Sequence, residues 1–162
     1  MAEKTLKDAT EVLIAVMKQT VLRKGETLPA GLMITKDGNL EPILTTGFVT
    51  SGDKESFAAR VKAILKREDA KAFVMGSEAW MIKRDSTTYA PGVESPRDAV
   101  DRIEVLAVTG EDRDGNYSMA ALEFVRDEAG IVVSITDEPV SYGKITDPEL
   151  ILDRGTFSGW FA

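Results

Sequence analysis

Apolar residues recur at helical spacing in the first part of the chain, over residues 4–23. They form one stripe, which consists of Leu6, Ala9, Leu13, Val16 and Met17. This pattern is typical of an amphipathic helix that packs one face on a core. Gly25 follows the stripe, as expected at a helix C-terminus.

A second helical stripe follows after residue 50 and consists of Phe57, Val61, Ile64 and Leu65. Asp53 is the residue type that caps a helix N-terminus, so we expect a helix from about Asp53 to Arg67. Between the two helices the chain reads GLMIT, KDGNLEP and ILTTGF. Two apolar runs around Asp37-Gly38-Asn39 predict a β-hairpin.

The next segment, KAFVMGSEAWMI at 71–82, is almost continuously apolar. Such a run is typical of a strand that is covered on both faces or central in its sheet. Three further strands are predicted from RIEVLAVT, YSMAALEFV and GIVVSI, and the turns EDRDGN and RDEAG join them as a meander.

Two segments have no clear periodicity. Residues 83–98 contain two prolines and one glycine and predict a long loop, which is either a binding loop or a disordered segment. Residues 137–162 form a less regular tail with Phe157, Trp160 and Phe161. We expect these aromatic side chains to dock on the chain's own domain, or, as the alternative, on a second copy in a homodimer.

The order of elements is therefore α-β-β-α-β-loop-β-β-β within a single domain spanning residues 1–162. Tight turns between consecutive strands predict an α+β fold. We expect a mainly antiparallel sheet of about five to six strands, with both long helices packed on it.

The chain has no cysteine and no histidine. Disulfides, thiolate nucleophiles and sulfur- or imidazole-ligated metal sites are therefore excluded, as is catalysis that depends on a Ser-His or Cys-His pair. Any chemistry has to use carboxylates, Lys, Tyr, Ser or Thr, or a hard metal bound by oxygen. No cofactor is expected.

The formal charge is −7, and residues 1–70 hold 11 Lys or Arg and 10 Asp or Glu, so the acidic excess lies in the second half. This balance argues against direct nucleic-acid binding, which needs basic patches. The start of the chain has no apolar signal-peptide core, and no run approaches the ~20 apolar residues that span a bilayer. We expect a cytoplasmic protein that does not contact a membrane.

The stretch DRDGNYSMAALE, from Asp112 to Glu123, has oxygen-bearing side chains at positions 1, 3, 5, 7 and 12, as a calcium loop does. However, Tyr117 occupies position 6, where such a loop needs glycine. Asp-Gly-Asn also occurs at 37–39, so a hairpin turn used twice is the favoured interpretation. A looser surface cation site is the alternative, formed by Glu111, Asp112 and Asp114.

An acidic residue, Glu78, interrupts the apolar run at 71–82. Strand alternation puts Glu78 and Trp80 on one face, and Arg102 and Glu104 share a face of the following strand. A cross-strand ion pair between Glu78 and Arg102 is the structural interpretation. The functional interpretation is a binding site around this strand and the 83–98 loop, formed by Glu78, Trp80, Arg84, Tyr89, Arg97, Arg102 and Glu104.

The string SEAWM at 77–81, a proline-containing loop and then R-x-E-x-L-x-V-T-x-E-D-R-D-G resemble small uncharacterised bacterial and phage-type proteins. The second motif comprises Arg102, Glu104, Leu106, Val108, Thr109 and residues 111–115. The resemblance covers about the middle quarter of the chain. It implies one domain built around this strand, loop and hairpin, and it implies no activity.

Because no catalytic motif is present, the leading hypothesis is a non-enzymatic module that binds a partner protein. The first alternative is a carboxylate-based enzyme that depends on Mg²⁺ or Ca²⁺, with its site around Glu78 and the 83–98 loop. The second is an acidic inhibitor of a nucleic-acid-binding protein.

Overall fold

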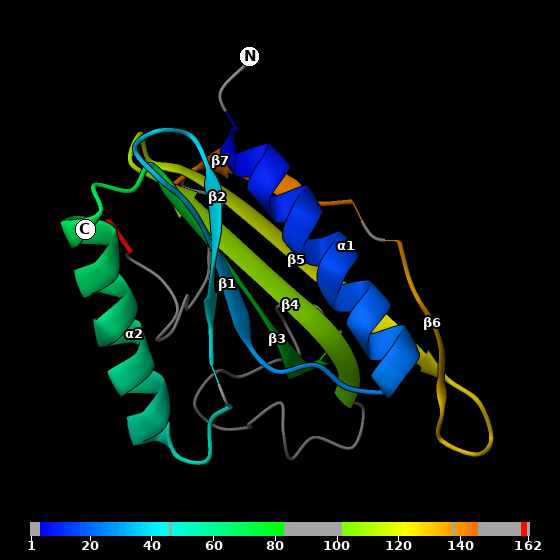
Figure 1. Cartoon of the computed structure of the whole chain (residues 1–162). Helices are drawn as coiled ribbons and strands as arrows, with labels where there is room; N and C mark the ends of the chain where they lie inside the picture. The colour runs from blue at the N-terminus through cyan, green and yellow to red at the C-terminus, as the bar shows by residue number, and fades with distance from the viewer. Residues whose placement is uncertain (1–3, 46, 83–101, 138, 146–159, 162) are drawn as a thin grey trace.

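The computed structural model describes residues 4–45, 47–82, 102–137, 139–145 and 160–161, without the side chains of residues 51, 82 and 102. The elements in chain order are α1 (Leu6–Lys24), β1 (Ala30–Ile34), β2 (Leu40–Leu44), α2 (Ser51–Arg67), β3 (Ala72–Ile82), β4 (Arg102–Asp112), β5 (Asn116–Arg126), β6 (Val132–Ile135) and β7 (Ser141–Lys144). They form an α+β fold, as the sequence predicts (Figure 1).

The seven strands form one sheet in the order β2-β1-β3-β4-β5-β6, with β7 paired to β5, and every pairing is antiparallel. The helices cover opposite faces of this sheet. In β1, Leu32 and Ile34 belong to the core beneath α1, whereas Met33 belongs to the core beneath α2. Successive strand residues point to opposite faces, so the central strand β3 is covered on both sides. This confirms the interpretation of its apolar run.

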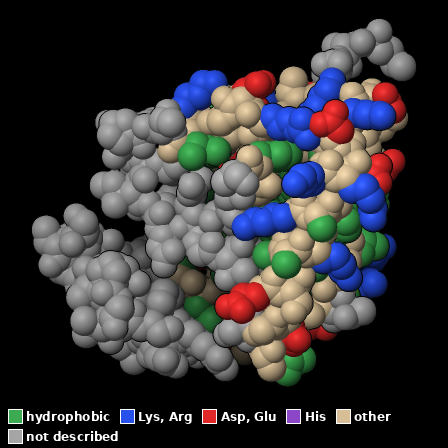
Figure 2. Space-filling model, turned by 90° about the vertical axis from the view of Figure 1, so that its left-hand side faces the viewer, with side chains coloured by type: hydrophobic (Ala, Val, Ile, Leu, Met, Phe, Trp, Pro, Cys, Tyr) green, Lys and Arg blue, Asp and Glu red, His purple; other side chains and the backbone are tan. Residues whose placement is uncertain are grey.

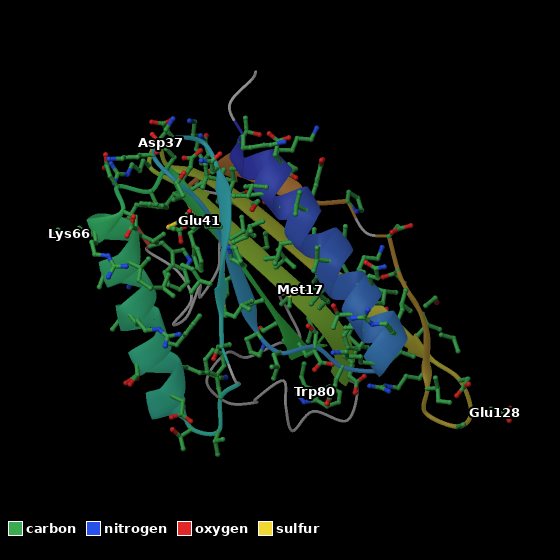
Figure 3. All side chains as sticks on the ribbon, viewed as in Figure 1. Met17, Asp37, Glu41, Lys66, Trp80 and Glu128 are labelled. Atoms are coloured by element: carbon green, nitrogen blue, oxygen red, sulfur yellow. The ribbon has the colours of Figure 1, made fainter. Side chains whose placement is uncertain are left out.

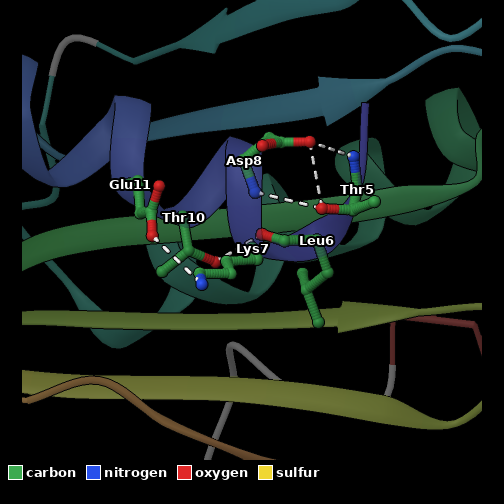
Figure 4. A network of polar contacts seen from close by, with 6 residues as sticks. All are labelled: Thr5, Leu6, Lys7, Asp8, Thr10 and Glu11. Carbon is green, nitrogen blue, oxygen red and sulfur yellow. Dashed lines mark hydrogen bonds and ion pairs between the residues drawn. The ribbon is translucent and has the colours of Figure 1, made fainter. Parts of the chain in front are cut away.

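The first helix begins at a capping box (Figure 4). The Thr5 hydroxyl accepts a hydrogen bond from the backbone N–H of Asp8, and the Asp8 carboxylate accepts one from the Thr5 N–H at 2.8 Å. These bonds hold the pKa of Asp8 below its ordinary value. The helix ends at Gly25, whose φ of 83° is left-handed, as predicted.

The buried stripe of α1 differs from the predicted one at one position. Leu6, Ala9, Leu13 and Met17 are buried, but Val16 is 55% exposed. Thr10, which is polar, is fully buried instead. Its hydroxyl lies 2.7 Å from the Leu6 carbonyl oxygen and 2.8 Å from the Ser118 hydroxyl, so the buried polar group is satisfied. Hydrophobicity therefore identifies most of the buried face of this helix, but it misplaces Val16 and misses Thr10.

The second helix begins two residues earlier than predicted, at Ser51, because its N-cap is Thr50. Asp53 occupies position N3 of a second capping box, three residues after the N-cap, so its predicted role as the N-cap was wrong. Its carboxylate accepts hydrogen bonds from the N–H groups of Val49 and Thr50, and these lower the pKa of Asp53.

Three hairpins use one turn design. Thr35, Asp112 and Asp127 each begin a turn in which the glycine three residues later has a positive φ, between 79° and 85°. Each glycine N–H donates to the carbonyl oxygen of the first residue. The side chain of that first residue accepts a hydrogen bond from the N–H four residues on. A tight turn closed by a left-handed glycine is a common three-residue hairpin loop, and it confirms the predicted meander.

Two strand assignments differ from the sequence-based ones. The second strand of the first hairpin is Leu40–Leu44, earlier than the predicted ILTTGF, because Pro42 is tolerated at the edge of a sheet. In the tail, Ser141–Lys144 forms β7 beside β5. The sequence predicts no strand there, because this short segment has no apolar alternation. The sheet therefore has one strand more than the upper estimate.

The aromatic tail contributes to the core on the α2 side. Trp160 is buried, and its ring lies 4.7 Å from that of Phe73 in an edge-to-face arrangement. The predicted docking on the chain's own domain is confirmed for Trp160, while Phe157 lies outside the described residues. Neither described helix is long and apolar enough to cross a membrane.

Candidate functional site

Three of the predicted site residues lie together on the face of the sheet that α1 covers. Gly76 of β3 lies directly under Met17 of α1, and strand alternation carries Glu78 and Trp80 to the same side. Glu104 of β4 is the residue directly opposite Trp80. Directly opposed residues share a face of the sheet, so Glu78, Trp80 and Glu104 all lie on the α1 side. Figure 3 shows Trp80 at the lower end of the sheet, below Met17.

Arg126 of β5 joins this group, and the sequence did not identify it. Its Nε donates to the Glu104 carboxylate at 2.7 Å, and its Nη1 donates to the Gly130 carbonyl oxygen at 2.6 Å. The bond to Glu104 raises the pKa of Arg126. Arg126 is thus oriented by two acceptors, and Glu104 already has a cationic partner.

Glu78 is in a different electrostatic position. Burial raises the pKa of its carboxyl group, and the negative charges of Glu104 and Glu26 raise it further. A hydrogen bond from the backbone of Thr27 and the charge of Arg126 act in the opposite direction. Glu78 as a whole is exposed, so the burial that raises the pKa of its carboxyl group is only partial. Glu78 is therefore the less compensated of the two strand carboxylates.

The predicted ion pair between Glu78 and Arg102 was wrong. The register of β3 and β4 places Leu106 opposite Glu78 and Ile82 opposite Arg102. Four residues of strand separate the two positions, which corresponds to about 13 Å. The charged partner within the group is Arg126, and it binds Glu104. Three other predicted site residues, Arg84, Tyr89 and Arg97, lie outside the described residues.

A groove lies next to this group, between α1 and the edge strand β2, and we call it the α1–β2 groove. It has a volume of about 950 Å³, and Glu78 is one of its lining residues. The helix and the strand diverge along their length (Figure 1), so Leu40 packs on the α1 core while Leu44 does not. The groove lies where the helix and the strand diverge, and residues of both elements line it.

Apolar side chains form the rim of the groove. Val12 and Val16 lie on α1, Leu28 on the connection to β1, and Leu44 on β2. Each is between 41% and 69% exposed. Exposed apolar side chains are unremarkable when scattered, but four that line one groove form a patch typical of binding surfaces. Thus the residue that broke the predicted stripe, Val16, is part of the wall of this groove.

The free edge of β2 is unsuited to the addition of another strand. β2 is the last strand of the sheet in the described part of the chain, and Pro42 lies at its centre. Proline has no backbone N–H to offer a new partner strand. The outer carbonyl oxygen of Leu44 accepts a long hydrogen bond from Arg60, at 3.5 Å. Pro42 therefore interrupts the row of backbone N–H groups that an added strand would need at this edge.

The acidic turn after β4 does not bring its carboxylates together. Glu111 and Asp112 are consecutive strand residues and point to opposite faces, and Glu111 is buried. Both carboxylate oxygens of Asp112 accept hydrogen bonds from N–H groups of the turn. No cluster of three potential metal ligands occurs among the described residues. The surface cation site at Glu111, Asp112 and Asp114 stays a prediction.

The outer surface of α2 is basic, in contrast to the acidic chain. The helix contains five Lys or Arg and two acidic residues, Asp53 and Glu55, both near its start. Lys and Arg side chains are prominent in Figure 2, which views the molecule from this side. Arg60 lies 5.2 Å from the centre of the Phe57 ring. The excess of acid is therefore carried by other parts of the chain.

Comparison with protein-family models, with curated proteins and with solved structures finds no match to this chain. The resemblance to bacterial and phage-type proteins accordingly stays a prediction.

Proposed function

We propose that this protein is a small, non-catalytic domain that binds a partner protein through the α1–β2 groove. The observation that carries the proposal is the apolar rim formed by Val12, Val16, Leu28 and Leu44, which the fold exposes to solvent. Burying such side chains against a partner contributes free energy roughly in proportion to the apolar area removed from water.

A protein segment suits this groove better than a small substrate does. Small-molecule sites usually enclose most of their ligand, and this groove is rimmed by exposed side chains along an open sheet edge. Amphipathic segments that lie in a surface groove are a recurrent mode of peptide recognition. The lack of cysteine is compatible with the cytoplasm as the place of action.

The other hypotheses have less support. In a metal-dependent enzyme around Glu78, the nearby carboxylate of Glu104 would be needed as a ligand, and Arg126 already binds it. An acidic inhibitor of a nucleic-acid-binding protein would need a continuous acidic face, and α2 presents basic side chains. A homodimer through the aromatic tail would have to form without Trp160, whose indole is buried in its own core.

The test compares affinity capture by the wild-type full chain and by three variants of it, followed by binding measurements with each purified candidate partner. Leu44→Glu and Val16→Glu put a charge on the groove rim, at positions exposed enough to leave the fold intact. Val49→Glu is the matched control, because Val49 is 94% exposed and lies outside the groove.

We expect a partner that binds the wild-type chain and the Val49→Glu control equally. Its affinity for either groove variant should be at least about tenfold lower, because a charged side chain cannot be buried without a partner. Equal affinity for all versions, with unfolding curves confirming that each is folded, would refute the groove as the binding site.

A further inference from the structure

The charges around the α1–β2 groove differ from one flank to the other. Lys24, Glu26 and Glu78 line the flank formed by the end of α1 and by β3, and they leave this flank with one net negative charge. Lys54, in the first turn of α2, lines the other flank. Between them the rim is apolar, so charge distinguishes the two flanks of the groove.

Glu78, on the acidic flank, forms no ion pair among the described residues. Arg126, whose charge lowers the pKa of Glu78, directs Nε to Glu104 and Nη1 to Gly130. The neighbouring acids Glu104 and Glu26 disfavour the charge of Glu78, and the pKa of its carboxyl group is raised. A cation brought by a ligand would offset this repulsion.

We infer that the occupant of the α1–β2 groove is a segment of a partner protein that presents apolar side chains together with a Lys or Arg, whose cation meets Glu78. The apolar side chains cover the rim, and the basic residue fixes the direction in which the segment lies. This inference rests on the proposed function, because it specifies the ligand of the same groove.

The charge complementarity determines specificity more than affinity. An ion pair at a partly exposed position contributes little to binding, whereas a like charge at the same position is disfavoured. The groove should therefore discriminate a segment with Lys or Arg from an otherwise identical segment with Asp or Glu. Replacing Glu78 by a cation should reverse the preference.

The experiment is a selection from a library of random 12-residue peptides displayed on phage, with the immobilised full chain as target. It is run in parallel on the wild-type chain and on the variants Glu78→Lys, Glu41→Lys and Val16→Glu. Glu41→Lys is the matched control for charge, because Glu41 is an exposed strand residue on β2 outside the groove lining (Figure 3). Thermal unfolding of each variant shows whether it is folded.

We expect the wild-type chain and the Glu41→Lys control to enrich peptides that combine apolar residues with Lys or Arg. The Glu78→Lys variant should enrich apolar peptides with Asp or Glu instead, and Val16→Glu should enrich neither. For one synthesised wild-type peptide, replacement of its basic residue by Gln should weaken binding about three- to tenfold. The same replacement in the peptide should have no effect on its binding to the Glu78→Gln variant. This variant keeps the shape of the side chain and provides the test if Glu78→Lys does not fold.

Two kinds of result overturn the inference, and they are distinguishable. The charge preference is wrong if the peptides enriched on the wild-type chain are apolar without a basic residue, or if Glu78→Lys enriches the same peptides as the wild-type chain. In that case, loss of enrichment on Val16→Glu still supports the groove as the binding site. If the wild-type chain enriches no peptides, or Val16→Glu enriches the same ones, the proposed function fails together with the inference.

Discussion

The buried hydroxyl pair between α1 and β5 provides a quantitative test of the core. Thr10 is 0% exposed and Ser118 is 1% exposed, and their oxygens lie 2.8 Å apart. The Leu6 carbonyl oxygen, 2.7 Å from Thr10 Oγ1, can only accept a hydrogen bond. Each hydroxyl has one hydrogen, so when Thr10 donates to Leu6, Ser118 donates to Thr10.

The expected free energies follow from what each substitution leaves behind. Thr10→Val keeps the shape of the side chain but leaves the buried hydroxyl of Ser118 without a partner, which costs about 1–3 kcal/mol. Ser118→Ala removes one hydrogen bond while Thr10 keeps Leu6, and it costs about 1 kcal/mol. The double variant leaves no hydroxyl unsatisfied. Its loss of stability should therefore be smaller than the sum of the single losses, by about 1 kcal/mol.

The assay is unfolding in urea, with the free energy of unfolding compared at equal m-values in a double-mutant cycle. Thr20→Val is the matched control, because the Thr20 hydroxyl also bonds a carbonyl oxygen one turn earlier, that of Val16, but is not buried. We expect it to change stability by less than about 0.5 kcal/mol. Additive single effects within about 0.3 kcal/mol would show that the two hydroxyls do not depend on one another.

Three further substitutions test other features of the structure. Glu78→Gln should raise the melting temperature at pH 7, because a raised pKa means that the charged carboxylate destabilises the folded state. The gain should disappear below about pH 4, where the carboxyl group is protonated in both the folded and the unfolded state. A lower melting temperature of the variant at pH 7 would contradict the raised pKa of Glu78. Thr50→Ala removes the N-cap of α2 and should lower the free energy of unfolding by about 1 kcal/mol in urea titrations, and an unchanged value would mean that the capping box contributes nothing. Gly76→Ala should cost about 1–3 kcal/mol in the same assay because its Cβ would overlap the Met17 sulfur, and a neutral effect would show that α1 does not pack closely here.

Most local features of this protein could be predicted from the sequence. The two helices, the glycine that ends α1 and the meander after residue 101 all depend on residues that are neighbours in the chain. The acidic turn is the clearest example. The recurrence of Asp-Gly-Asn indicated a hairpin, and the structure has the same turn at Thr35, Asp112 and Asp127.

The candidate site could be predicted only in part. Strand alternation correctly placed Glu78 with Trp80, but the pairing of β3 with β4 is not set by a tight turn, because residues 83–101 separate them. The predicted partner Arg102 was therefore displaced by several residues. Arg126 reaches Glu104 from the next strand, a diagonal contact that depends on the register of β4 with β5.

The sequence by itself determined the α+β class, the ends of the helices and the turns, because capping, glycine conformation and periodicity act over a few residues. Only the tertiary structure decided which faces the helices cover and that α1 diverges from β2. That divergence leaves Val16 exposed, whereas the packing of α1 on β5 buries Thr10 on the same helix. The groove and its charged flanks exist because distant segments pack at a particular angle, and no local pattern encodes that angle.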